Sequence, residues 1–208
     1  MNGCVNSDQT NVTTVEPIFP NAGTDKLACI SDTAFVLISL TQPGGKWSGA
    51  GVIQNASDYY FSPSNSGAGN LVLTYTIHEG TTCETRDQLS ITVNDLPVVR
   101  LGPDLSTCID TTCVQISDFS PNNGAGIIPA TAYFLGEGQI SSNGLICPAS
   151  NLPGDYSIYY QYTEPTTGCS NLDSMIFRVH PLPVANFAID SVFCINTSRE
   201  ALNLSRGD

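Results

Sequence analysis

Short runs in which apolar and polar residues alternate recur along the whole chain. These runs are rich in β-branched and aromatic residues, which is typical of strands with one buried face. Clusters of Gly, Pro, Asn, Asp and Ser separate the runs. In no segment do apolar residues recur at helical spacing over the length of a helix. The pattern predicts an all-β chain. The clearest expected strands span residues 35–40, 71–77, 89–93, 156–162 and 175–179.

Two linked patterns of cysteine and aspartate each occur three times. In the first, an aspartate stands four residues before a cysteine, at Asp25/Cys29, Asp104/Cys108 and Asp190/Cys194. In the second, a cysteine stands four residues before an aspartate, at Cys4/Asp8, Cys83/Asp87 and Cys169/Asp173. Both series step by 79 and then by 86 residues, which indicates tandem repeats of that length. We call the first cysteine of a repeat early and the second one late.

The proline-bearing seams predict where one repeat ends and the next begins. A strand-like run ending in proline follows each late cysteine, at Pro17, Pro97 and Pro183. We therefore expect repeat 1 at residues 17–96 and repeat 2 at residues 97–182, flanked by the last strand of an upstream repeat (1–16) and the first strands of a downstream one (183–208). The total of 208 residues suits about two β-sandwich modules. Short seams with proline favour semi-rigid connections.

Several motifs of repeat 1 resemble a known type of surface repeat. They are Trp-Ser-Gly-x-Gly-Val at residues 47–52, Phe-x-Pro at 61–63, Leu-x-Leu-Thr-Tyr-Thr at 71–76 and the closing x-Val-x-x-Leu-Pro. Together with Asp-x3-Cys, they resemble the immunoglobulin-like, PKD-like repeats of very large Bacteroidetes surface proteins, including SprB-type gliding-motility adhesins. Repeat 2 departs from the pattern, because Phe134 replaces the tryptophan and Cys113 and Cys147 are added.

The resemblance implies a fold, a location and a modification. It implies tandem immunoglobulin-like β-sandwich modules, type IX secretion and an extracellular filament on the cell surface. Members of that family also carry O-glycans at Asp-Ser/Thr-apolar sites. Four hydroxyl residues of this chain fit that pattern: Thr33, Thr111, Ser174 and Ser191.

The cysteine content favours disulfides over metal. Eight cysteines accompany only two histidines, which is typical of an oxidising compartment. Cys113 and Cys147 occur in repeat 2 alone, and this predicts a bond between them. A loop of that size adds roughly 3–4 kcal/mol of stability in a chain-entropy model.

The six repeated cysteines allow three pairing schemes. The first closes each repeat, as Cys29–Cys83 and Cys108–Cys169. The second follows the constant spacing of 25 residues, as Cys4–Cys29, Cys83–Cys108 and Cys169–Cys194. The third joins the early cysteine of one repeat to the late cysteine of the next, here Cys29–Cys169.

The immunoglobulin-like topology helps to choose between these schemes. It places Cys29 and Cys83 at opposite ends of the module, roughly 25–30 Å apart for strands of this length. A disulfide requires Cα atoms within about 7 Å. The third scheme is therefore favoured, and the other two stay open.

Charge and motifs exclude several classes of function. The net charge of −12, with 7 Lys and Arg against 19 Asp and Glu, argues against nucleic acid or an anionic membrane surface as partner. No apolar run approaches the roughly 18 residues of a membrane span, so we expect no direct membrane insertion. His78 and His180 are the only histidines, Gly-x-Ser-x-Gly is absent, and no cysteine spacing or acidic loop suits zinc or calcium. We therefore expect no enzyme, no cofactor and no metal.

A structural role is the leading hypothesis. The repeats would form a stalk in a secreted surface adhesin, with the neighbouring repeats of the same chain as partners. The alternative is that the modules themselves bind a polysaccharide or a protein. For that reading, the outward-facing members of Tyr59-Tyr60 and Tyr159-Tyr160 are the best candidates.

Overall fold

A computed structural model describes residues 3–12, 14, 16–41, 43–124, 126–137 and 140–185. The chain splits into two compact units. The first comprises Met1–Pro97 and Glu164–Ser170, and the second comprises Val98–Thr163 and Asn171–Asp208. A short segment of repeat 2 thus belongs to the first unit.

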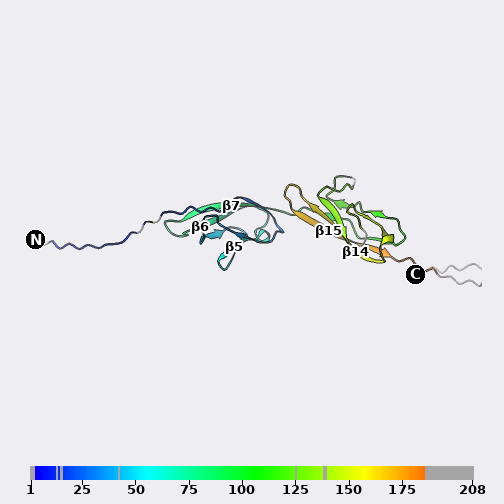
Figure 1. The fold of residues 1–208 in the computed structure, drawn as a ribbon, viewed down its shortest axis with the longest axis horizontal. Helices are drawn as coiled ribbons and strands as arrows, with labels where there is room; N and C mark the ends of the chain where they lie inside the picture. The colour runs from blue at the N-terminus through cyan, green and yellow to red at the C-terminus, as the bar shows by residue number, and fades with distance from the viewer. Residues whose placement is uncertain are drawn as a thin grey trace, which may run out of the picture. The chain divides into compact units, whose positions relative to one another are not determined.

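Repeat 1 forms two sheets. Its elements are β1 (Lys26–Cys29), β2 (Phe35–Leu37), β3 (Lys46–Ser48), β4 (Val52–Asn55), β5 (Asp58–Phe61), α1 (Pro63–Ser66), β6 (Gly69–Ile77) and β7 (Thr85–Asn94). One sheet has the order β1-β7-β6-β3 and the other the order β2-β5-β4. Strand β1 runs parallel to β7, whereas the long strands β6 and β7 form an antiparallel hairpin (Figure 1).

Repeat 2 reproduces the larger of these sheets and contains two two-stranded sheets besides it. Its elements are β8 (Arg100–Leu101), β9 (Leu105–Cys108), β10 (Val114–Gln115), β11 (Phe119–Ser120), β12 (Ala132–Gly136), β13 (Leu145–Ile146), η1 (Pro148–Ser150), β14 (Gly154–Thr163) and β15 (Ser170–His180). The order β9-β15-β14-β12 matches β1-β7-β6-β3, and β9 again runs parallel to the last strand. Strand β10 pairs with β13, as β2 pairs with β5.

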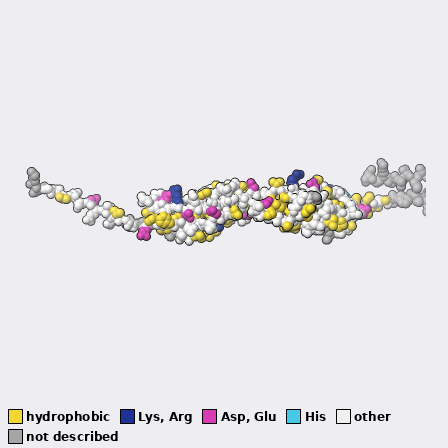
Figure 2. Space-filling model, turned by 90° about the horizontal axis from the view of Figure 1, so that it is seen from above, with side chains coloured by type: hydrophobic (Ala, Val, Ile, Leu, Met, Phe, Trp, Pro, Cys, Tyr) yellow, Lys and Arg dark blue, Asp and Glu magenta, His cyan; other side chains and the backbone are white. Residues whose placement is uncertain are grey.

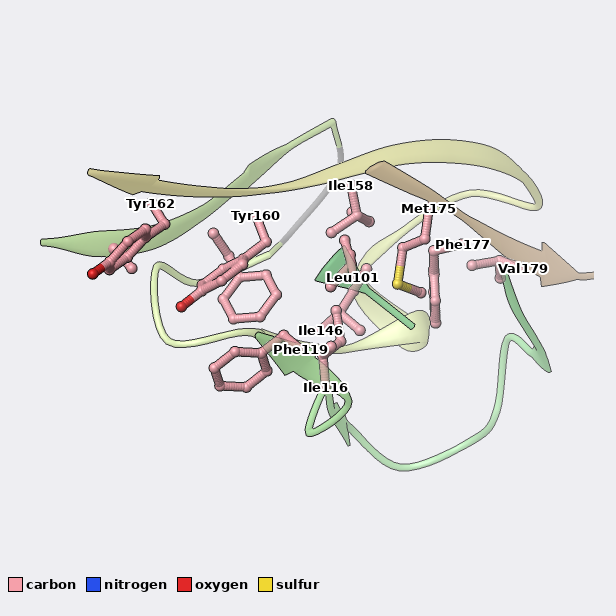
Figure 3. Close-up of a cluster of buried hydrophobic side chains, with 12 residues drawn as sticks. Leu101, Ile116, Phe119, Ile146, Ile158, Tyr160, Tyr162, Met175, Phe177 and Val179 are labelled. Atoms are coloured by element: carbon pink, nitrogen blue, oxygen red, sulfur yellow. The ribbon is translucent and has the colours of Figure 1, made fainter. Parts of the chain in front are cut away.

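The sheets of each repeat enclose an apolar core. In repeat 1, Trp47, Leu73 and Ile91 of the larger sheet are buried together with Leu37 and Phe61 of the smaller one. The corresponding core of repeat 2 contains Ile158, Tyr160 and Phe177 together with Ile116, Phe119 and Ile146 (Figure 3). The chain is therefore all-β and consists of immunoglobulin-like β-sandwich modules, which confirms the expected fold class.

Packing explains the aromatic-x-Gly pattern that the two repeats share, as Trp47-Ser48-Gly49 and Phe134-Leu135-Gly136. Trp47 pairs with Tyr75 across β3 and β6, with ring centroids 5.0 Å apart, and only 5% of Trp47 is exposed. Phe134 and Tyr160 repeat this pair in repeat 2, also at 5.0 Å. The glycine that follows lies against the neighbouring strand. A Cβ atom on Gly136 would stand 2.7 Å from the carbonyl oxygen of Ser157, so a larger residue has no room.

Two local features differ from the expected strands. The strand expected over residues 35–40 ends at Leu37, and the Leu40 N–H instead donates to the carbonyl of Asn21 at 2.9 Å. In addition, one-turn helices, α1 and η1, follow β5 and β13, each with proline in its first turn. A turn this short leaves no helical periodicity in the sequence, although proline favours it by fixing φ.

The expected repeat boundaries stay predictions, because the described parts of the flanking segments contain no strand. Among residues 3–12, 14 and 16 there is no strand, and residues 183–185 carry none either. The remainder of the expected downstream strands, residues 186–208, lies outside the described residues. No helix in the described part of the chain is long and apolar enough to cross a membrane.

Candidate functional site

A disulfide joins cysteines of the two repeats. Cys29 bonds to Cys169 across a sequence separation of 140 residues, with their Cα atoms 5.6 Å apart. Cys29 ends β1 of repeat 1, and Cys169 lies in the loop between β14 and β15 of repeat 2. That loop, Glu164–Ser170, is part of the first compact unit. The bond therefore ties a segment of repeat 2 covalently into the first unit.

The parallel pairing of β1 with β7 positions Cys29. The ladder sets Cys29 opposite Asn94, and the next N–H, of Ile30, donates to the Asn94 carbonyl at 2.9 Å. A turn follows, in which the Asp32 N–H donates to the Cys29 carbonyl at 2.9 Å and an Asp32 carboxylate oxygen accepts from the Cys29 N–H at 2.8 Å. Cys29 is thus held beside the end of β7.

Cys83 lies beyond the other end of the same strand. It precedes β7, which runs from Thr85 to Asn94. At about 3.3 Å per residue, this strand separates Cys83 from Cys29 by roughly 30 Å. A bond between these two cysteines within repeat 1 would require the sheet to come apart.

Cys169 is held by the backbone of its own loop and is fully buried. Its carbonyl accepts from the Glu164 N–H at 2.9 Å, and its N–H donates to the Thr167 hydroxyl at 3.2 Å. Thr81 makes the same 3.2 Å contact with the N–H of Cys83 in repeat 1. These threonines were not among the expected site residues, although the sequence shows the shared Thr-x-Cys spacing at residues 81–83 and 167–169.

The second disulfide lies inside repeat 2. Cys113 bonds to Cys147 across a separation of 34 residues, with a Cα–Cα distance of 4.0 Å. The two cysteines adjoin the paired residues Val114 and Ile146, so the bond closes the end of the β10–β13 ladder. Cys147 also occupies the N-cap of η1. The sequence predicted this pair because both cysteines occur in repeat 2 alone.

The remaining described cysteines carry no disulfide. Cys4 and Cys108 are exposed and Cys83 is half-buried. The structure contains the bond that the third pairing scheme names. Because the sulfurs of Cys29 and Cys169 are bonded to each other, every pair in the first two schemes that includes either cysteine is wrong. Cys194 lies outside the described residues.

In repeats 1 and 2, the aspartate that precedes the early cysteine binds the last strand of the same repeat. Asp25 accepts a hydrogen bond from the Ser90 N–H at 3.0 Å, and Asp104 accepts one from the Ile176 N–H at 2.8 Å. Both carboxylates lie just before the parallel ladder begins, at Lys26 in repeat 1. They extend the attachment of the first strand to the last one.

In repeats 1 and 2, the aspartate that follows the late cysteine makes the reverse contact. Asp87 accepts from the Ala22 N–H at 2.7 Å, and Asp173 accepts from the Leu101 N–H at 2.9 Å. The Leu101 N–H, together with that of Ser174, lowers the pKa of the Asp173 carboxyl below its usual value. The repeated aspartates therefore stabilise each module.

Neither histidine forms a catalytic arrangement. The Nε2 atom of His180 lies 2.7 Å from the Ser106 hydroxyl, and both residues are exposed on the β9–β15 sheet. His78 follows β6 with a positive φ of 52°, as expected at a turn. Within the described residues, no group of three His, Cys, Asp or Glu side chains is placed to hold a metal ion. We assign no catalytic role to these side chains.

Three of the four expected O-glycosylation positions lie in the described part of the chain. Thr33 is exposed in the segment between β1 and β2, and Ser174 is exposed within β15. Thr111 is half-buried, and its hydroxyl accepts a hydrogen bond from Thr107 at 2.7 Å. Ser191 lies outside the described residues. Glycosylation at these positions stays a prediction.

The tyrosines proposed as a ligand surface differ in burial. Tyr160 is fully buried, its hydroxyl donates to the Pro121 carbonyl at 2.6 Å, and burial raises its pKa to about 12. Tyr60 and Tyr159 are half-buried. Tyr59 is also half-buried and borders a cavity of about 330 Å³, whose lining includes Val36, Ile38, Pro43, Trp47 and Tyr75.

Basic side chains are few and dispersed. Figure 2 shows Lys and Arg scattered on the visible face, without a patch. Lys46 and Arg178 form exposed ion pairs with Glu79 and Asp155, and the exposed Arg86 pairs with the half-buried Glu84. Such exposed pairs add little to stability. This arrangement offers no concentrated positive surface on the face shown.

Comparison with known proteins gives weak structural matches and no family. No protein-family model matches the sequence, and no curated protein matches it. Human mucin-like protocadherin EC1-2 is similar at 8% identity and a TM-score of 0.28, over 78% of this chain and 98% of that one. Drosophila N-cadherin EC1-4 is similar at 13% and 0.32, over 80% of this chain and 50% of that one. The titin domains z1z2, in complex with telethonin, are similar at 13% and 0.28, over 83% and 100%. These matches assign no function to the chain.

Proposed function

We propose that this chain is a load-bearing segment in a tandem array of immunoglobulin-like modules, forming the stalk of an extracellular surface adhesin. One observation carries the proposal. The Cys29–Cys169 bond links β1 of repeat 1 to the β14–β15 loop of repeat 2, and so joins consecutive modules covalently at a second place besides their seam. Neighbouring repeats of the same chain are the partners.

The bond changes the covalent path along which tension travels. A force applied at the two ends passes from the N-terminal side to Cys29, across the disulfide to Cys169, and on toward the C-terminus. Residues 30–168 lie off this path and cannot be stretched out while the bond is intact. At about 3.4 Å per residue, a segment of 140 residues has a contour length of roughly 480 Å.

The compartment follows from the same chemistry. Disulfides persist in oxidising, extracellular surroundings, and a stalk that depends on them belongs outside the cell. The finer assignments are gliding motility, type IX secretion and O-glycosylation at Thr33, Thr111, Ser174 and Ser191. They rest on the resemblance of the repeat motifs alone.

Force–extension measurements on the full chain, held by its two termini, test the load-bearing role. We expect the oxidised chain to withhold the roughly 480 Å protected by the loop, and the Cys29→Ser/Cys169→Ser variant to release all of it except the roughly 115 Å still closed by the Cys113–Cys147 bond. The matched control is Cys113→Ser/Cys147→Ser, which lacks the other bond and keeps the limit. Release of the whole length by the oxidised wild-type chain would contradict the proposal.

Ligand binding by the modules is a second candidate function, and one observation favours it. Tyr59 borders the cavity of about 330 Å³ beside Trp47 and Tyr75, and aromatic rims suit ligands with apolar faces, including sugars. A polysaccharide array probed with the wild-type chain and with Tyr59→Ala tests this function. Binding that Tyr59→Ala abolishes would support it, and an array without signal would reject it. The control is Tyr159→Ala, because Tyr159 is not among the residues that line this cavity.

A further inference from the structure

We propose that Cys83 and Cys108 form the same inter-repeat bond with the modules on either side of this pair. Cys108 would bond to the late cysteine of the repeat that follows, and Cys83 to the early cysteine of the repeat that precedes. The inference rests on the proposed tandem array. It extends one observed bond into a continuous covalent chain through every module.

Cys108 has the same backbone setting as the bonded Cys29. Its ladder sets Cys108 opposite His180, as the ladder of repeat 1 sets Cys29 opposite Asn94. The N–H of the next residue, Ile109, donates to the His180 carbonyl at 2.9 Å, the same length as the Ile30–Asn94 bond. A turn then returns a backbone N–H to the cysteine carbonyl, at 3.1 Å in repeat 2 and 2.9 Å in repeat 1. Cys108 is thus presented as Cys29 is.

Cys83 has the same backbone setting as the bonded Cys169. Each lies in the loop between the two longest strands of its repeat. The N–H of each cysteine donates to a threonine hydroxyl two residues earlier, at 3.2 Å in both repeats, from Cys83 to Thr81 and from Cys169 to Thr167. Of the two free cysteines, Cys108 therefore corresponds to Cys29 of the observed bond and Cys83 corresponds to Cys169.

The order of the observed bond explains why these thiols are free in this chain. In Cys29–Cys169 the early cysteine comes from one repeat and the late cysteine from the next. By the same rule, the partner of Cys108 would follow residue 208 and the partner of Cys83 would precede residue 1. Cys108 is exposed and Cys83 is only half-buried, so both can be reached by a partner.

The bond forms by ordinary thiol–disulfide exchange. The thiolate of Cys108 attacks a small-molecule disulfide such as oxidised glutathione, and one glutathione thiolate leaves. The thiolate of the neighbouring late cysteine then attacks the mixed disulfide at the Cys108 sulfur and releases the second glutathione thiolate. Two protein thiols are oxidised, the small disulfide is reduced to two thiols, and the two thiol protons pass to them.

A fully bonded array would contain two interleaved covalent paths. Each path runs from a late cysteine to the early cysteine 25 residues later, which belongs to the next repeat. It then crosses a disulfide to the late cysteine of the repeat after that, two repeats beyond the late cysteine at which it began. Only about 25 residues, or roughly 85 Å of contour, lie on each path for every two repeats. The rest of every module would be shielded from tension.

A chain in which residues 97–182 are duplicated in place tests the inference, because a whole repeat then follows Cys108. The new seam keeps Leu-Pro-Val, since Pro97-Val98 replaces Pro183-Val184 after Leu182. The chain is oxidised with glutathione, its free thiols are alkylated, and unreduced peptides are identified by mass spectrometry. We expect a Cys29–Cys169 peptide, together with a Cys108–Cys169 peptide that contains about half of all Cys108.

Single substitutions identify which copy supplies the cysteine. Cys108→Ser in the first copy should abolish the Cys108–Cys169 peptide, and the matched Cys108→Ser in the second copy should leave it in place. Survival of this peptide in the first-copy variant would overturn the inference, as would complete alkylation of Cys108 in the unsubstituted duplicated chain. Either result with Cys29–Cys169 intact leaves the proposed function standing, whereas loss of Cys29–Cys169 itself defeats that function.

Discussion

Replacing both Cys113 and Cys147 by serine removes a bond that lies wholly within repeat 2. The ladder that it closes has only two residue pairs, Val114 with Ile146 and Gln115 with Leu145. Two pairs cannot hold β10 against β13 by themselves. We therefore expect the double variant to destabilise the second unit while leaving the first unit unchanged.

The size of the loop sets the magnitude. A separation of 34 residues corresponds to a loop-closure contribution of about 4 kcal/mol in the chain-entropy model. In a module of this length, 1 kcal/mol moves the unfolding temperature by about 4–8 °C. The transition of the second unit should accordingly fall by roughly 15–30 °C.

The chain contains one tryptophan, which makes the two units separable in the assay. Trp47 is buried in the core of repeat 1, so its fluorescence follows the first unit, whereas far-UV circular dichroism follows both. The matched control is Cys83→Ser/Cys108→Ser, which removes two free thiols and no bond. A variant whose second unit melts as the wild type does would refute the reasoning, and so would an equal fall in the Trp47 transition.

Two further substitutions test the contacts that repeat between modules. Gly136→Ala places a Cβ atom 2.7 Å from the Ser157 carbonyl and should destabilise the second unit by about 1–3 kcal/mol in urea unfolding, while Gly154→Ala, which meets nothing within 4 Å, should not. Asp173→Asn should cost about 1 kcal/mol at pH 7. Because the Leu101 N–H lowers the pKa of Asp173, this stabilisation is present above about pH 4 and is lost as pH falls through the lowered pKa, so the two urea midpoints should converge once the pH lies below that lowered pKa.

The long strands could be predicted from the sequence because each buries one alternating face. Strand β7 buries Leu89, Ile91 and Val93, and this alternation is visible in the residue types alone. The short strands were harder to predict, since two-residue elements such as β8 and β11 exist only through their pairing with each other. The burial of Trp47 could also be expected, since a tryptophan in a short strand usually fills the space between sheets.

The repeated polar residues show where sequence reasoning stops. The spacing identified Asp25 and Asp87 as markers of the repeat, but their hydrogen-bond partners lie 65 residues away in sequence. The three cysteine schemes share the same spacings, so spacing alone could not separate them. What separates them is the parallel register of β1 on β7, which places Cys29 at the end of the strand opposite to Cys83.

Peptide mapping of the unreduced 208-residue chain tests the covalent tie between modules most directly. We expect one linked peptide that contains Cys29 and Cys169, and alkylated peptides that contain Cys83 and Cys108. A map that links Cys29 to Cys83, or that finds Cys29 alkylated, would contradict the tie and with it the load-bearing role.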